Sequence, residues 1–267
     1  MQHGCILALF IESYLVFRNL RNKVRAYLFL NCAAMLVNNI GYILELSSRT
    51  EEAYITALQL SYAGRVWISF ALLLFTAELC KVAFPAAAKA VLFALHPAIY
   101  AVVLSLKSIR FTMTGAFASI QHGNGIVHNL YTLLLIVYMA LAFFWLFRAL
   151  KREAARAAKK RILTVLLAIL AESACVIVQM FALIPLTRVF DVTIFGYTVG
   201  TVFMFIAIFR CDLLGTKEIA RETMIDRLSE GIIALDNGGF IQYFNEPAKK
   251  IYPSLAIGSD KVPEEVI

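Results

Sequence analysis

Residues 126–147, IVHNLYTLLLIVYMALAFFWLF, and the fourteen residues that follow, RALKREAARAAKKR, show the pattern that recurs along this chain. The first stretch is almost wholly apolar and has the length, about 20 residues, that a helix needs to cross the hydrocarbon core of a bilayer. The second stretch is strongly basic. An apolar helix followed by a short cluster of Lys and Arg is typical of a membrane span that ends on the cytoplasmic side.

Apolar stretches of this kind recur along the chain. Of its 267 residues, 61% are hydrophobic and 16% are charged, with a mean hydropathy of +0.76, whereas soluble domains are about 45–50% apolar. A soluble enzyme is therefore disfavoured. We predict an all-α membrane protein, a seven-transmembrane helical bundle with helices at residues 3–17, 26–46, 60–79, 86–106, 126–147, 162–184 and 192–210. The first is short, about 22 Å, so either the bilayer thins around it or the natural N-terminus starts upstream.

The positions of the basic residues predict the orientation of this bundle. The first, third and fifth connections carry thirteen Lys and Arg residues, and the second, fourth and sixth carry four: Arg18, Arg21, Lys23, Arg25, Lys81, Lys89, Arg148, Lys151, Arg152, Arg156, Lys159, Lys160 and Arg161 against Arg49, Lys107, Arg110 and Arg188. Because basic residues favour cytoplasmic loops, we expect a multi-pass protein of the plasma membrane with its N-terminus outside and its C-terminus in the cytoplasm. The net charge of +7 thus indicates topology, and we expect no nucleic-acid partner.

The composition changes after the seventh block. Residues 212–230 combine charged residues with spaced apolar ones, an amphipathic pattern that predicts a cytoplasmic signalling helix. Residues 231–236 and 240–244 predict two strands joined at 237–239, because Asn-Gly favours a tight hairpin turn. Asn245 is placed to cap a short helix with Pro247 in its first turn. One hairpin and one helical turn are too small to be stable alone, so we expect residues 231–267 to be an incomplete second domain.

These segments resemble a known family. Residues 62–81 (YAGRVWISFALLLFTAELCK), the start of the fifth helix at residues 128–131 (HNLY) and residues 213–236 are similar to the N-terminal seven-transmembrane sensor region of bacterial receptor histidine kinases, followed by the start of an α+β PAS domain. One departure is Asp191, after which the family often has a proline.

The resemblance implies the sensor module of a bacterial two-component receptor. It relays an extracellular or intramembrane cue through helix seven and the PAS domain to a cytoplasmic output, a histidine kinase or alternatively a diguanylate cyclase. A small membrane transporter is the alternative from another class. The implied partners are the lipid bilayer, a second copy of the chain and an unidentified small-molecule or physical cue. The sequence itself holds no catalytic motif, and we expect no cofactor or metal; a PAS ligand is unspecified.

Ionisable side chains at membrane depth are costly and mark candidate sites. Glu12, Arg65 and Glu172 are the candidates here. Glu172 lies near the middle of its helix, so we expect it to face the bundle, to be protonated or to be paired. Arg65 either extends its guanidinium towards the outer surface or pairs with Glu172 or Glu12. Each of the three is either part of a structural ion pair or in contact with a ligand or switch.

Polar residues within the apolar blocks give further candidates. His96 precedes Pro97, a helix breaker, and is either a core histidine at a kink or a ligand contact. Asn38 provides either interhelical hydrogen bonds or one wall of a polar pocket. Gly196 and Gly200 form a small-xxx-small pattern, which serves either packing within the chain or a dimer seam. His122 and His128, placed at the outer end of the fifth helix, are six residues apart and not on one helical face, which disfavours a metal site.

Overall fold

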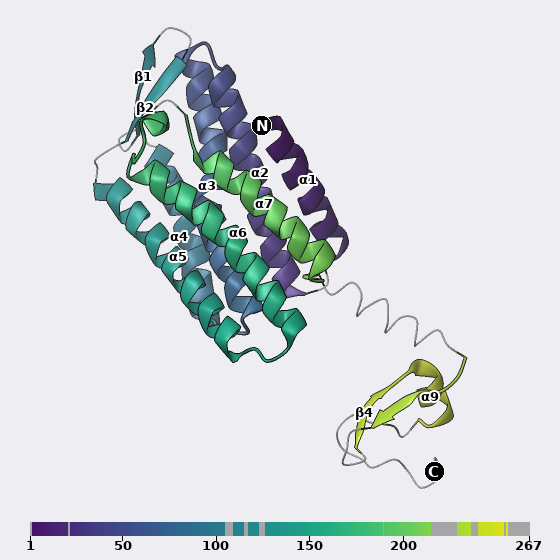
Figure 1. Cartoon of the computed structure of the whole chain (residues 1–267). Helices are drawn as coiled ribbons and strands as arrows, with labels where there is room; N and C mark the ends of the chain where they lie inside the picture. Colours follow the sequence, from purple (N-terminus) through teal and green to yellow (C-terminus); the bar gives the residue numbers. More distant parts are fainter. Residues whose placement is uncertain are drawn as a thin grey trace. The chain divides into compact units, whose positions relative to one another are not determined.

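The computed structural model describes residues 2–20, 22–104, 109–114, 117–122, 126–188, 190–214, 229–235, 240–253 and 255. Two compact units divide the chain after Leu214. The elements of the first unit are α1 (Gln2–Arg18), α2 (Lys23–Ser47), α3 (Glu51–Leu79), α4 (Ala86–Leu104), β1 (Ile109–Thr114), β2 (Phe117–His122), α5 (Ile126–Arg152), α6 (Arg156–Met180), the 3₁₀ helix η1 (Pro185–Arg188) and α7 (Thr193–Arg210). The predicted helical bundle is therefore confirmed (Figure 1).

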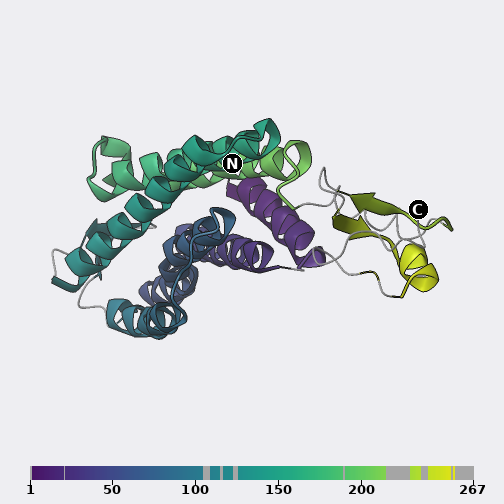
Figure 2. The ribbon, with the colours of Figure 1, turned by 90° about the horizontal axis from the view of Figure 1, so that it is seen from below.

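The helices form a closed ring. Each helix contacts its neighbour in sequence, and α1 also contacts α7, so that α1 lies between α2 and α7 (Figure 2). Within the ring, α3 also contacts α5, and its residues from Phe70 to Ala77 are all buried. Among the described residues, α2, α3, α5, α6 and α7 are long and apolar enough to cross a membrane, whereas α1 has 17 residues.

Two helices, α3 and α6, begin well before the starts that the apolar pattern predicts. α3 begins at Glu51, nine residues before the predicted start, because the Thr50 side chain caps it by accepting a hydrogen bond from the backbone N–H of Ala53 (3.3 Å). α6 begins at Arg156, since its basic first turns contain good helix formers. It ends at Met180, four residues before the predicted end, and Pro185 then begins η1. The apolar stretch marks the bilayer core, and polar helix formers extend beyond it.

A β-hairpin lies where the sequence analysis placed a connection. β1 and β2 pair antiparallel, with Ile109 opposite His122 and Thr114 opposite Phe117. His122 therefore lies in β2, and its placement at the outer end of the fifth helix was wrong, whereas His128 is in α5. The hairpin lies at the same end of the bundle as the α2–α3 turn and η1 (Figure 1). We call this the hairpin end, and the opposite end, where α7 finishes, the exit end.

The second unit contains β3 (Ile233–Leu235), β4 (Ile241–Phe244) and α9 (Glu246–Ile251). The strands pair antiparallel, and Asn245 caps α9 by accepting a hydrogen bond from the backbone N–H of Ala248 (3.0 Å). The predicted strand, strand and capped helix are thus confirmed as elements. The predicted turn at 237–239 and most of the predicted signalling helix, residues 215–228, lie outside the described residues.

Two glycines bring α2 and α3 into direct backbone contact. A Cβ atom added at Gly64 of α3 would overlap the backbone oxygen of Ala34 and lie 2.5 Å from the backbone nitrogen of Asn38, both on α2. One added at Gly41 of α2 would lie 2.5 Å from the Cα of Ser61 on α3. Since small residues allow helices to pack closely in membranes, α2 and α3 form one tightly joined pair.

Candidate functional site

Arg65 lies at the centre of a polar network near the hairpin end of the bundle. Its Nη2 is 2.7 Å from Oδ2 of Asp191 in an ion pair, and its Nε donates to Oδ1 of Asn38 (3.1 Å). The side chains of Arg65 and Asp191 are 27% and 11% exposed. The predicted pairing of Arg65 with Glu172 or Glu12 was therefore wrong, because the segment before α7 brings Asp191 to it. Asn38, buried on α2, lies in this network as one of its acceptors.

Asp191 connects the start of α7 to α2 and α3. Its Oδ1 accepts hydrogen bonds from the backbone N–H and the hydroxyl of Thr193 (3.0 and 2.6 Å). Its own backbone N–H donates to the hydroxyl of Tyr42 on α2 (2.9 Å). Sequence analysis missed Asp191 as a site residue, although an acidic residue directly before a span is a natural partner for an arginine inside the bundle. We call Asn38, Tyr42, Arg65 and Asp191 the Arg65 network.

Glu12 and Glu172 are the buried carboxyl groups of the bundle centre. Glu12 on α1 is 2% exposed, and Glu172 on α6 is 8% exposed. The two interact electrostatically, and the Glu12 carboxyl lies within hydrogen-bonding reach of Cys32 on α2. Among the described residues, neither carboxyl forms an ion pair. Of the alternatives for Glu172, the structure shows that its side chain is buried inside the bundle.

Gly196 and Gly200 pack against α6 of the same chain. A Cβ atom at Gly200 would overlap Oε1 of Glu172 and lie 2.8 Å from its Cγ, and one at Gly196 would lie 3.0 Å from its Cα. Both glycines are buried. The interpretation of these residues as a dimer seam is therefore wrong for this face, because α6 already covers it. The alternative, packing within the chain, is what the structure shows.

His96 holds α4 against the rest of the bundle. Among the described side chains of α4, only that of His96 is buried, at 1% exposure. Its Nδ1 is 2.7 Å from the backbone oxygen of Leu92, and its ring stacks on Phe70 with the centroids 4.4 Å apart. Trp67 and Tyr138 stack with it as well, at 5.3 and 6.0 Å. These contacts agree with the interpretation of His96 as a core histidine.

Replacing His96 by leucine is expected to loosen α4, because the change removes the ring stacking and the bond to Leu92. We expect a loss of roughly 1–3 kcal/mol from the docking of this helix, measured as faster hydrogen–deuterium exchange confined to α4. His96→Phe retains the ring and should lose less. Leu95→Ala, at an exposed neighbouring position, is the control. Unchanged exchange of α4 in His96→Leu would contradict this assignment.

The chain leaves α7 through a short buried segment, Cys211–Leu214. Asp212 has a φ of 52°, so the chain turns sharply after α7 ends at Arg210. Leu213 and Leu214 fold back into the core of the bundle. Residues 212–214 therefore do not continue α7 as a helix, which corrects the first part of the predicted signalling helix at 212–230. A non-glycine residue with positive φ is strained, and the burial of the two leucines offsets that strain.

Two arginines bind the backbone of this exit segment. Nη2 of Arg25, at the start of α2, donates to the backbone oxygen of Leu214, and its Nη1 donates to that of Asn19 (2.8 Å). Nε of Arg161 on α6 donates to the backbone oxygen of Cys211 (3.1 Å). Sequence analysis counted both arginines as loop charges and missed these roles, because the sequence does not show which loop cation turns inward.

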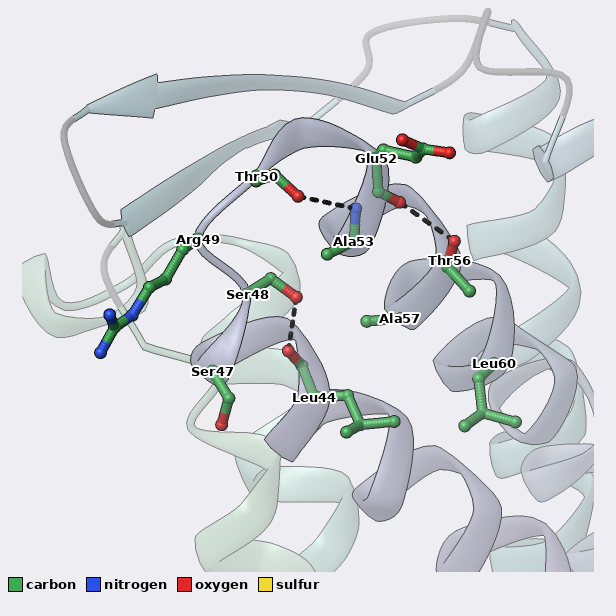
Figure 3. A pocket seen from close by; sticks show the side chains of 10 residues that line it. All are labelled: Leu44, Ser47, Ser48, Arg49, Thr50, Glu52, Ala53, Thr56, Ala57 and Leu60. Atoms are coloured by element: carbon green, nitrogen blue, oxygen red, sulfur yellow. Dashed lines mark hydrogen bonds between the residues drawn. The ribbon is translucent and has the colours of Figure 1, made fainter.

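A shallow groove of about 860 Å³ lies on the outside of the α2–α3 turn (Figure 3). Its walls combine apolar side chains such as Leu44 and Leu60 with polar ones such as Arg49 and Glu52. Figure 3 shows the Arg49 side chain pointing away from the groove. None of the predicted site residues lines this groove, so it is distinct from the Arg65 network.

Comparison with known protein families matches residues 4–217 to the N-terminal 7TM region of histidine kinase. The chain belongs to this family. No curated protein matches the chain. The family and the apolar helices together show a multi-pass protein embedded in a membrane, and the family indicates a membrane sensor input module.

Within the 7TM region, the candidate residues fall into separate places. The structure brings Arg65 and Asn38 together at the hairpin end, and Glu12 and Glu172 together at the centre. His96 lies apart from both groups, between α4 and α3. Sequence analysis missed two acidic residues near these sites, Asp191 and Glu45. Each of them lies at the edge of a predicted span. Attention to ionisable residues at span edges would have found both.

Proposed function

We propose that this 7TM region is the input module of a receptor histidine kinase and that α7 carries the signal between its two ends. The observation that supports this most directly is that α7 is held by charged groups at both ends. Asp191 binds Arg65 directly before α7 begins, and Arg161 and Arg25 bind the backbone just after it ends. A cue that alters the Arg65 network would shift α7 and thereby the exit segment, as population shift between two arrangements requires.

We infer the orientation from the distribution of charge. The exit end carries most of the Lys and Arg residues of the connections, and basic loops favour the cytoplasm. The hairpin end then faces the outside, where a cue would reach the Arg65 network. The same proposal includes a homodimer, as in receptors of this type, with a seam on a face other than Gly196 and Gly200.

The second unit supports a relay through a PAS domain. Asn245 accepts hydrogen bonds from the backbone N–H groups of Ile232 and Ala248 and donates to the backbone oxygen of Glu230 (2.9 Å). Asn245 thus ties the approach to β3 to the start of α9, in the order expected for a PAS start. The family favours a histidine kinase as the output beyond this relay; a diguanylate cyclase is the alternative and is distinguished by assaying its product.

The test joins the whole chain to the catalytic core of a histidine kinase and measures autophosphorylation in membranes. Arg161→Gln is expected to change the basal rate several-fold, because it removes the hydrogen bond to the Cys211 carbonyl that holds the exit segment. The direction of the change identifies whether the held segment corresponds to the inactive or the active kinase.

Lys160→Gln is the matched control. It removes the same charge from the adjacent exposed position, so it tests whether charge alone matters. Asp191→Asn provides the second arm at the other end of α7. If folded Arg161→Gln and Asp191→Asn both signal like the wild type and like Lys160→Gln, transmission through α7 is rejected.

A further inference from the structure

Glu45, which has no role in the proposed function, has a buried carboxyl group near the Arg65 network. It lies on α2 and is 6% exposed, and its Oε1 has no hydrogen-bond partner among the residues that the structure describes. The hydroxyl of Ser61 lies within hydrogen-bonding reach of the same carboxyl, but it also donates to Oδ1 of Asn38 (3.3 Å). Leaving a buried polar atom without a hydrogen bond costs free energy. Such an atom in a native structure therefore indicates an additional binding partner or a functional role.

The charges around Glu45 leave an excess of negative charge. The charged side chains that interact with it are Arg65 and Asp191. Arg65 is already in its ion pair with Asp191, so two carboxyl groups share one guanidinium. Because an unpaired charge inside a protein is unfavourable, the Glu45 carboxyl must either be protonated or be balanced by one additional positive charge.

Three buried tyrosines lie on the same two helices, α2 and α3, as Glu45 and Arg65. Tyr42 on α2 and Tyr54 and Tyr62 on α3 all interact electrostatically with Glu45. All three are buried, between 2% and 8% exposed. Aromatic faces attract cations, and sets of aromatic residues recognise ammonium groups. Metal cations such as Ca²⁺ instead require six or more oxygen ligands, and no group of three or more His, Cys, Asp or Glu gathers among the residues that the structure describes.

We propose that Glu45, with Tyr42, Tyr54 and Tyr62, binds the ammonium group of a small organic amine. The carboxylate supplies the opposite charge and the open acceptor, and the phenol rings replace water around the cation. This inference rests on the proposed function in that it names the class of cue, an amine that enters at the hairpin end. The site is closed in this structure, so entry requires α2 and α3 to separate from their neighbours near the α2–α3 turn.

Tyr42 connects this site to α7. The hydroxyl of Tyr42 accepts the hydrogen bond from the backbone N–H of Asp191, and its ring also contacts Phe190 edge-on with the centroids 5.9 Å apart. An ammonium ion beside Glu45 also repels Arg65, which shares the region. Binding therefore acts on two of the contacts that hold the start of α7, those of Tyr42 and Arg65 with Asp191.

The experiment measures binding of benzylammonium chloride to the whole purified chain, from the midpoint of thermal unfolding and by isothermal calorimetry. We expect saturable stabilisation of the wild type, and no effect of neutral benzyl alcohol or of NaCl at equal ionic strength. Glu45→Gln, which keeps the shape of the side chain, is expected to lower the affinity at least tenfold. Glu52→Gln, at an exposed position near the same end, is the matched control and should bind like the wild type.

Two results would overturn the proposal. In the first, the amine does not bind the wild type saturably and Glu45→Gln stabilises the protein. This result identifies Glu45 as a protonated structural group. The other is equal affinity of Glu45→Gln and the wild type, which places the amine elsewhere. Neither assay involves kinase output, so binding without any change in autophosphorylation rejects the proposed function and leaves the amine site intact.

Discussion

Gly64→Ala is expected to separate α2 from α3 and to cost the fold about 3 kcal/mol, the upper part of the range for overpacking a well-packed interior. The added methyl group would meet backbone atoms of Ala34 and Asn38 rather than the end of a flexible side chain. Neither atom can move without displacing α2 as a whole. Because Asn38 is also an acceptor of Arg65, the change is expected to disturb the Arg65 network as well.

The measurement is the midpoint of thermal unfolding in detergent, with the yield of monodisperse protein as a second readout. Gly4→Ala is the control, because a Cβ atom there meets nothing within 4 Å, and alanine favours the helix over glycine by up to about 1 kcal/mol. We expect opposite signs for the two substitutions. A Gly64→Ala protein as stable as the wild type would show that α2 and α3 are less closely joined than the structure has them.

Asp191→Asn is expected to leave Arg65 without its ion-pair partner and to destabilise the protein by about 2 kcal/mol. Breaking a fully buried pair costs about 3–5 kcal/mol, and the cost is lower here because the Arg65 side chain retains 27% exposure. Glu45 reduces it further, since it also attracts Arg65. The bonds from Thr193 are retained by the asparagine oxygen, so the substitution tests the charge rather than the turn.

A double-mutant cycle identifies the source of this effect. Arg65→Gln combined with Asp191→Asn removes both charges, and we expect it to cost less than the sum of the two single changes, because contacting residues are coupled. Glu51→Gln, an exposed acidic position in the first turn of α3, is the control and should stay within about 0.5 kcal/mol of the wild type. Strict additivity in the cycle would contradict direct pairing of Arg65 with Asp191.

The bundle was predictable from the sequence because membrane spans leave a strong pattern. Seven apolar stretches set the number and order of the helices, and the helix ends differ mainly where polar helix formers extend a helix, as at Glu51 and Arg156. The β1–β2 hairpin was missed, although Ile109, Phe111 and Met113 alternate with polar residues, the two-residue period of a strand. That alternation was overlooked because the segment lies between two spans.

The candidate site was predictable only in part. Arg65, Glu12 and Glu172 could be found as ionisable residues within spans, because placing such a side chain in a bilayer costs much free energy whichever way it points. Partners were not predictable, because pairing depends on which helices adjoin and how they are rotated. Asp191 lies 126 residues from Arg65, and Arg25 lies 189 residues from Leu214; nothing local in the sequence relates such positions.

The turn at Asp212 determines which kinds of motion α7 can pass on. A continuous helix transmits torque, so a rotation at one end reappears at the other. Here α7 ends at Arg210, and the four non-helical residues Cys211–Leu214 follow it, anchored by two leucines and two guanidinium groups. Under the proposed function, rotation about the α7 axis would be lost at this segment. The change passed on would then be whether the segment is docked, so the module would switch between two positions.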